Sequence, residues 1–500
     1  MGPSSSLFIL IKSLSKSEKR YFKRFCTIYS KEKQNNYLLL FNAIVEQKEY
    51  DEQQIKSQFR NEKFVKQLNV LKVYLYRLII KSLRQFYTSS DKDMILKDLV
   101  THSLILLKKG LYDESYRMIN SAKETARFEK NHFALAEILS LEKKLVGQMN
   151  IRSKEELLRK ITFEEDVILT EILLFQKYTK IMNVLDADLI SCMFTSGDKM
   201  YSEKYEHISY IPLLEKEPDT CSEETLHLFY NCRFMLNILQ KSKEDILSDF
   251  EKIICILKKS GFLLNRTGND SWGCLFHIII YFLREGEINE AENKLNEIKE
   301  ALLPSTNRIS DSHLCGPEIY ADIFELILIV SIADVNRSSL LVEKIKKYFA
   351  DKPGTCTDKM HCTAYYFIAL YYFMIRKNRL SLDYLKKFAE EYDLSRNSEI
   401  EFKLKILYVL NNYELGELDH LEYYLINNLR SLNRYEASKE DYSDFFRTFL
   451  KIIRSKTNAE ADELLKFLKQ RFMFRSGHSE SVFLLQYFNI GIWNASKIYN

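Results

Sequence analysis

The sequence predicts an all-α protein, a right-handed superhelical array of antiparallel helical hairpins with a basic N-terminal helical segment. Only 13 Gly and 6 Pro occur in 500 residues, so few positions favour tight turns or interrupt helices. Apolar residues make up 46% of the chain, which is enough for a continuous core. A hairpin turn pattern recurs, and a repeat array explains a length that exceeds one compact core.

The clearest hairpin is Leu99–Ala122, in which Gly110 is predicted to join two helices. In the tetratricopeptide repeat (TPR), the turn has a glycine, an aromatic or apolar residue two positions later, and a small residue five positions after the glycine. The small residue lets the second helix pack closely on the first. We therefore predict a TPR-like α-solenoid. The pattern is matched by Gly110, Tyr112, Ser115 and Ile119, and again by Gly286, Ile288, Ala291 and Leu295.

Weaker copies of this turn extend through the rest of the chain. The copy at Gly416 keeps the apolar positions but lacks the small residue, and the copy at Asn378 is fainter. Further turns near Asn150, Lys241 and Asp334 complete a series spaced by roughly 38–48 residues. We therefore expect irregular TPR-like repeats over residues 91–475 and a C-terminal capping helix within residues 476–500.

Residues 1–90 differ from the remainder in charge. They carry 17 basic and 7 acidic side chains, a net charge of +10, whereas the rest of the chain carries 56 and 62, a net charge of −6. Such an asymmetry indicates two functional parts. Four helices are predicted in the basic part, near residues 15–29, 37–47, 51–59 and 62–87. Ser15 and Glu18 form a capping box for the first, and Asp51 caps the third.

Basic side chains line one side of the first and the fourth of these helices. Such rows neutralise phosphates and give salt-sensitive binding. They are also typical of the solvated side of an amphipathic helix, or of a face that docks on the acidic remainder, and we favour these interpretations. Val70, Val73 and Ile80 fall on the same side of the longer helix, so we expect its middle to be covered on both faces. Candidate nucleic-acid or partner-binding residues are Lys16, Lys19, Arg20, Lys23, Arg24, Lys63, Lys66, Arg77, Lys81 and Arg84.

Aromatic side chains are abundant, with 31 Tyr and 32 Phe. We expect most of them in the core, because helical cores bury large aromatic area. A few tyrosines on inner helices are candidates for lining a peptide groove. The densest set is Tyr365, Tyr366, Phe367, Tyr371, Tyr372 and Phe373.

Catalytic and metal-binding signatures are absent from the sequence. There is no G-x-S-x-G, no P-loop and no H-E-x-x-H. The nine Cys occur without a C-x-x-C pair, as expected of ordinary thiols in a reducing compartment, and the cluster of Cys356, His361 and Cys362 lacks further ligands. No apolar run reaches the roughly 20 residues that a bilayer requires. We therefore predict a cytoplasmic non-enzymatic protein without cofactor, metal or membrane segment.

Both ends of the sequence resemble a family of bacterial tetratricopeptide-like proteins. The resemblance implies an all-helical fold and a bacterial cytoplasm, and it transfers no catalytic residue. It rests at the N-terminus on KSLSKSEKRYFKRF (Lys12–Phe25) and FVKQLNVLKVYLYRLIIKSLR (Phe64–Arg84), and at the C-terminus on LYVLNNYELGELDHLEYYL (Leu407–Leu425) and YFNIGIWNASKI (Tyr487–Ile498).

Two functions follow as hypotheses. The first is a protein–protein interaction scaffold that binds a protein or peptide on the concave face of the repeat array. The alternative is a nucleic-acid-binding regulator that uses the basic helices of residues 1–90. Neither hypothesis fixes an oligomeric state or the identity of the partner.

Overall fold

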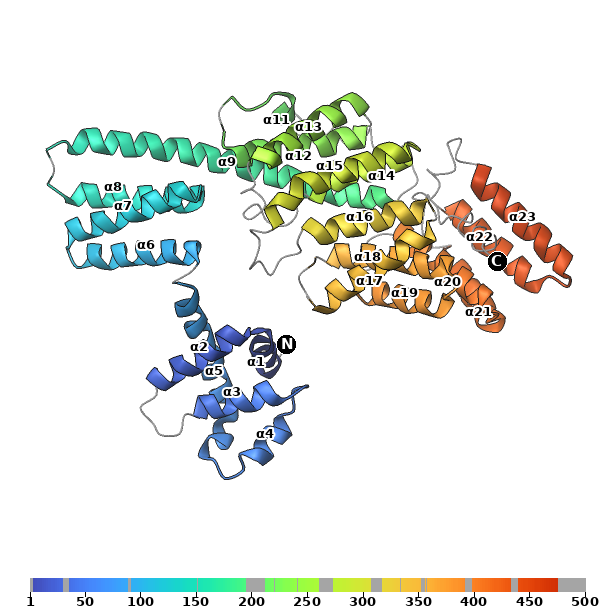
Figure 1. Ribbon diagram of the computed structural model, residues 1–500, viewed down its shortest axis with the longest axis horizontal. Helices are drawn as coiled ribbons and strands as arrows, with labels where there is room; N and C mark the ends of the chain where they lie inside the picture. The colour runs from blue at the N-terminus through green and yellow to red at the C-terminus, as the bar shows by residue number, and fades with distance from the viewer. Residues whose placement is uncertain are drawn as a thin grey trace. The chain divides into compact units, whose positions relative to one another are not determined.

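The structure is a computed structural model, and it describes residues 3–29, 36–88, 91–150, 152–194, 212–219, 221–240, 242–259, 273–306, 317–332, 334–351, 356, 358–391, 398–432 and 439–474. Within these residues there are twenty-two α-helices, two short 3-10 helices and no strand (Figure 1). The predicted all-α class is therefore confirmed. The capping helix predicted within residues 476–500 lies outside the described residues. The chain divides into two compact units, 1–172 (unit 1) and 173–500 (unit 2).

The first part of unit 1 is a bundle of five α-helices around one hydrophobic cluster. Leu7, Phe22, Phe41 and Ile79 lie buried in this cluster. The four helices predicted here are present at nearly the expected positions, and α1 is an additional helix that the sequence analysis missed. The elements are α1 (Pro3–Ser13), α2 (Lys16–Tyr29), α3 (Asn36–Glu46), α4 (Glu52–Gln58), the 3-10 helix η1 (Lys63–Gln67) and α5 (Leu68–Tyr87).

Local sequence explains where these helices begin. The Glu18 amide donates to Ser15 Oγ at 3.2 Å, and the Ser15 amide donates to Glu18 Oε2 at 2.6 Å, which is the predicted capping box. The Asp51 carboxylate accepts from the amides of Gln53 and Gln54 at the start of α4. Both predicted N-caps are therefore confirmed.

Four more helices follow in unit 1, and each packs on the next among α6, α7 and α8. The hairpin predicted at Gly110 joins α6 to α7. The two helices approach closely through Ser103 and Ser115, which are both buried, and Ser115 Oγ donates to the Ser103 carbonyl at 2.9 Å. These elements are α6 (Lys92–Lys108), α7 (Tyr112–Phe128), α8 (His132–Gln148) and α9 (Lys154–Phe194), which continues past residue 172.

Unit 2 consists of helices that pack as sequence neighbours around one large hydrophobic cluster (Figure 1). Some alternate helices also touch, such as α16 with α18 and α18 with α20. The elements are α11 (Pro212–Glu215), α12 (Glu223–Gln240), α13 (Lys243–Lys259), the 3-10 helix η4 (Gly273–Phe276), α14 (His277–Arg284), α15 (Ile288–Thr306), α16 (Pro317–Ser331), α17 (Val335–Asp351), α18 (Asp358–Met374), α19 (Asn378–Glu391), α20 (Ser398–Glu414), α21 (Leu418–Leu432), α22 (Lys439–Arg454) and α23 (Asn458–Phe474).

One turn geometry recurs between consecutive helices. A residue with positive φ donates its N–H to the carbonyl three residues earlier, and the next residue donates to the carbonyl five residues earlier, which is the Schellman pattern. After α6, Gly110 donates to Leu107 and Leu111 donates to Leu106, both at 3.0 Å. The positive-φ residues of the five turns with both bonds are Gly110, Lys130, Gly286, Arg376 and Gly416.

The structure confirms the predicted turns at Gly110, Gly286 and Gly416 and the turn beside Asn378, whereas the predicted turn residue Lys241 lies outside the described residues. Gly110, Gly286 and Gly416 each connect two helices, and Arg376 closes the turn before Asn378. Helices also meet near the three further positions, where α8 precedes α9, α12 precedes α13, and α16 precedes α17.

We predict that Gly110→Ala lowers the free energy of opening of the α6–α7 hairpin by about 1 kcal/mol. An L side chain in the left-handed region costs roughly 1–2 kcal/mol, and φ of Gly110 is 76°. Hydrogen exchange of the α6 and α7 amides in the full chain measures the effect.

Gly147→Ala in α8 is the matched control. A Cβ added at either glycine meets no atom within 4 Å, and only Gly110 has a positive φ. We therefore expect Gly147→Ala to leave the stability of the protein unchanged or to raise it slightly. Equal losses of stability in the two variants would show that backbone strain at Gly110 does not cause the loss.

Candidate functional site

The five basic candidates on α2 lie at the surface of the N-terminal bundle. Lys19 is half-buried and the other four are exposed. Within the described residues none of the five forms an ion pair, and Glu18, the one acidic residue of α2, accepts a hydrogen bond from Tyr87 Oη at 2.6 Å. The candidates on this helix are Lys16, Lys19, Arg20, Lys23 and Arg24.

The other five candidates lie on η1 and α5, and all are exposed. Arg84 pairs with Asp98 at 3.1 Å. α2 packs directly on α5, with the rings of Tyr21 and Phe86 5.1 Å apart, so both rows of basic residues belong to one bundle. The candidates on these elements are Lys63, Lys66, Arg77, Lys81 and Arg84.

The expectation that the middle of α5 is covered on both faces is wrong. Val70, Val73 and Ile80 are 53%, 39% and 44% exposed. The inner face of α5, with Leu75 and Ile79 fully buried, packs on α1, α2 and α3. The outer face keeps its apolar side chains in solvent beside the basic ones, and Arg84 near its end pairs with Asp98 of α6.

A buried ammonium group joins α5 to α4. Lys72 is 1% exposed, forms an ion pair with Glu52, and lies 5.3 Å from the ring centre of Tyr50. Glu52 also pairs with Lys56 at 2.7 Å. Hydrogen bonds from Lys56 and Lys72 lower the pKa of Glu52 to about 2. This ion pair links α4 to the buried side of α5.

We predict that Glu52→Gln lowers the free energy of opening of α4 and α5 by about 2 kcal/mol at neutral pH, because it leaves the Lys72 ammonium without its carboxylate. The wild-type contribution is complete above the ordinary glutamate pKa, about 4.3. It is lost as the pH falls towards 2, since the folded-state pKa is lowered. Hydrogen exchange of α4 and α5 amides between pH 7 and pH 2, corrected for intrinsic rates, measures this dependence.

The double variant Glu52→Gln, Lys72→Met is the control. Replacing a buried ion pair by an apolar side chain of similar length is often neutral. We expect the double variant to regain most of the stability lost in Glu52→Gln, without the acid dependence. A double variant less stable than the single one would contradict the assigned role of the pair.

A pocket of about 490 Å³ lies on one face of unit 2, between α17, α18 and α19. Tyr372 and Tyr384 form its aromatic wall, with ring centres 5.6 Å apart in a stacked arrangement. Leu380 contributes an apolar side chain that is 41% exposed. The lining residues are Lys346, Tyr372, Leu380, Asp383, Tyr384, Lys386, Lys387 and Glu390.

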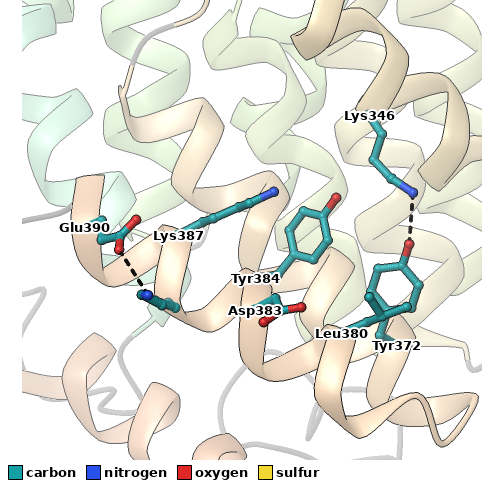
Figure 2. Close-up of a pocket in the computed structure, with 8 residues that line it drawn as sticks. Lys346, Tyr372, Leu380, Asp383, Tyr384, Lys387 and Glu390 are labelled. Carbon is teal, nitrogen blue, oxygen red and sulfur yellow. Dashed lines mark hydrogen bonds and ion pairs between the residues drawn. The ribbon is translucent and has the colours of Figure 1, made fainter.

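Two lysines place ammonium groups beside these tyrosines. Lys346 Nζ donates to Tyr372 Oη at 3.2 Å and contacts Glu343 at 2.7 Å, and these hydrogen bonds raise the pKa of Lys346. Lys387 Nζ lies 4.5 Å from the ring centre of Tyr384. Figure 2 shows the Tyr384 hydroxyl pointing into the space between the two amino groups. Within the described residues, this hydroxyl forms no hydrogen bond.

The pocket combines aromatic, apolar and charged side chains. It offers the small accessible parts of Tyr372 and Tyr384, which are 5% and 8% exposed, together with ammonium groups and the carboxylates of Asp383 and Glu390. Burial raises the pKa of Tyr384 further above neutrality, so its hydroxyl stays protonated. Such a lining suits a short segment with both apolar and polar side chains.

The aromatic cluster of α18 behaves mostly as predicted. Tyr366, Phe367, Tyr371, Tyr372 and Phe373 are buried in the core, and Tyr365 is half-buried. The sequence analysis missed Tyr384, Lys346 and Lys387, which come from two other helices. The turn pattern at Asn378 predicts that α19 packs on α18, and it thereby indicates that Tyr384 and Lys387 lie near Tyr372. It gives no indication of Lys346, which lies on α17.

Metal and thiol chemistry find little support in the structure. The described residues contain no cluster of three or more His, Cys, Asp or Glu that would hold a metal ion. His361 stacks on Tyr365, with ring centres 6.0 Å apart, and meets Phe349 edge-on. Six described cysteines are free thiols, but Cys356 is disulfide-bonded, so the expectation of thiols throughout is wrong at this residue.

In the described parts of the chain, no helix combines the length and the apolar character that crossing a membrane requires. Comparisons of the chain with protein-family models, with curated proteins and with solved structures give no match.

Proposed function

We propose that this chain is a non-enzymatic interaction scaffold, a right-handed TPR-like α-solenoid that binds a protein or peptide. The recurring Schellman turns, the packing of sequence neighbours and the contacts between alternate helices support a stack of hairpins. The resemblance of both ends to bacterial tetratricopeptide-like proteins agrees with this architecture and with a bacterial cytoplasm.

The pocket between α17, α18 and α19 is the observation that carries this proposal. Tyr372 and Tyr384 supply rigid aromatic area at low entropic cost, which is the usual means of anchoring a peptide. Leu380 extends the apolar surface, and the lysines at its edge orient polar groups of the peptide. Because the tyrosines are held by stacking and by Lys346, the site is formed before a partner arrives.

We predict that Leu380→Arg abolishes capture of a stoichiometric protein partner by the tagged full chain from a lysate of the source cells. The substitution places a long charged side chain at the mouth of the pocket. Leu380 is exposed, so the fold is expected to persist, and circular dichroism checks this. Quantitative mass spectrometry of the captured proteins is the measurement.

Leu418→Arg is the matched control. Leu418 is the first residue of α21, after the turn at Gly416, and it is 38% exposed, close to the 41% of Leu380. We expect this variant to capture the partner as the wild type does. Loss of the partner in both variants, or capture of nucleic acid alone by the wild type, would refute the scaffold.

A nucleic-acid-binding regulator is the second candidate, and the basic face of α2 favours it. Arg20 and Arg24 point away from the bundle and form no ion pair within the described residues. Guanidinium groups that are not neutralised by neighbouring carboxylates are available to phosphates.

For this candidate we predict that the full chain binds labelled duplex DNA or RNA and that Arg20→Glu, Arg24→Glu weakens binding. Two lost phosphate contacts lower the slope of log affinity against log salt by about 2. Fluorescence anisotropy from 50 to 200 mM salt measures the slope. Lys258→Glu, Lys259→Glu on α13 makes the same charge change elsewhere and should leave it unaltered. Absence of salt-dependent binding to any duplex removes this candidate.

A further inference from the structure

The outer face of α5 has a regular pattern of aliphatic and basic side chains, of which phosphate binding would use only the basic ones. Five side chains follow one another along this face at intervals of three and four residues. They are Val70, Val73, Arg77, Ile80 and Arg84, which we call the α5 seam. All five are exposed, and the three aliphatic ones are β-branched.

We propose that the α5 seam is the docking site for an acidic amphipathic helix of a partner protein. The proposal concerns unit 1 alone and does not depend on the pocket of unit 2.

The spacing of the seam selects a helical partner. Positions separated by three and then four residues lie along one straight line of a helix, as the a and d positions of a coiled coil do. The seam runs from Val70 to Arg84, fifteen residues, and its first and last Cα atoms are therefore about 21 Å apart at a rise of 1.5 Å per residue. Val70, Val73 and Ile80 are knobs of the kind that fit between the side chains of an added helix of about four turns.

The charges along the seam select an acidic partner. α5 contains no Asp or Glu. Arg77 lies at the centre of the seam and forms no ion pair within the described residues, and Lys66 and Lys81 are exposed on either side of it. Acidic side chains that flank an apolar stripe on the partner helix would meet these groups while the aliphatic residues are buried.

Other occupants fit less well. A second α5 would set Arg77 against a stripe with the same positive charges. A phosphate backbone would leave Val70, Val73 and Ile80 in water. A membrane surface would have to bury the Arg77 guanidinium together with Val73 and Ile80, because the three alternate along the same line, and burying this charge in lipid is costly.

A synthetic peptide tests the proposal on the full chain. The probe is a fluorescein-labelled peptide of three heptads, with Val at a, Leu at d and Glu at e and g. A control peptide has Lys in place of each Glu. Fluorescence anisotropy measures binding of each. We expect the acidic peptide to bind and the basic peptide to fail.

Three variants locate the binding. We expect Arg77→Glu and Ile80→Asp each to weaken binding of the acidic peptide at least about tenfold, because each places a negative charge in the seam. Both residues are exposed, and hydrogen exchange of α1 and α3 verifies that the bundle stays folded. Lys48→Glu makes the same charge change as Arg77→Glu on the turn between α3 and α4, and should leave the affinity within about twofold.

Three outcomes would overturn the proposal. In the first, the acidic peptide does not bind. In the second, it binds, but Arg77→Glu and Ile80→Asp do not weaken the binding. In the third, a 20-base-pair DNA duplex or phosphatidylglycerol vesicles bind more tightly than the peptide, and this binding depends on the same two residues. Leu380→Arg should not affect the peptide, so the outcome is independent of that for the pocket of unit 2.

Discussion

The helical hairpins of this protein depend on one backbone constraint, a single residue with positive φ that ends a helix and reverses the chain. The two backbone hydrogen bonds of this turn satisfy carbonyl groups that would otherwise lack a partner at the end of the helix. The turn is short, so the next helix must run antiparallel to the one before it and pack on it. Five turns with both bonds repeat this constraint in units 1 and 2.

At two of these turns, the close approach of the paired helices follows from the residue five positions after the one with positive φ. In α7 this residue is Ser115, which donates to the Ser103 carbonyl at 2.9 Å, and in α19 it is Ser381, which donates to the Ala369 carbonyl at 2.8 Å. Asn411 of α20 then donates to Ser381 Oγ at 3.0 Å, so a third helix is tied to the same point. The two serine hydroxyls and the Asn411 amide nitrogen are hydrogen-bonded at these contacts, whereas Asn411 Oδ1 has no partner within the described residues. The apolar faces around them form the core.

The two candidate surfaces arise where this packing leaves side chains uncovered. On α5, one face enters the bundle core and the other keeps aliphatic and basic residues in solvent. Between α17, α18 and α19, two tyrosines that also contribute to the core present their remaining surface to a pocket beside two lysines. Both surfaces combine apolar and cationic side chains, and the pocket also contains the carboxylates of Asp383 and Glu390.

Local chemistry made the helices, the caps and most turns predictable. Ser15 with Glu18, Asp51, and the glycines at 110, 286 and 416 act on backbone groups only a few residues away, so their spacing in the sequence is sufficient. Lys130 and Arg376 also take positive φ, but neither residue type favours this conformation, so the sequence carries no such signal there.

Tertiary packing decided which surfaces remain accessible. The sequence shows that α5 is apolar on two sides, but only the positions of α1, α2 and α3 determine that Val70, Val73 and Ile80 stay exposed while Leu75 and Ile79 are buried. Likewise, Tyr372 and Tyr384 are twelve positions apart on different helices, and Lys346 comes from a third. Burial and the meeting of distant side chains depend on long-range contacts between helices, whereas helix formation and capping depend on neighbours in the chain.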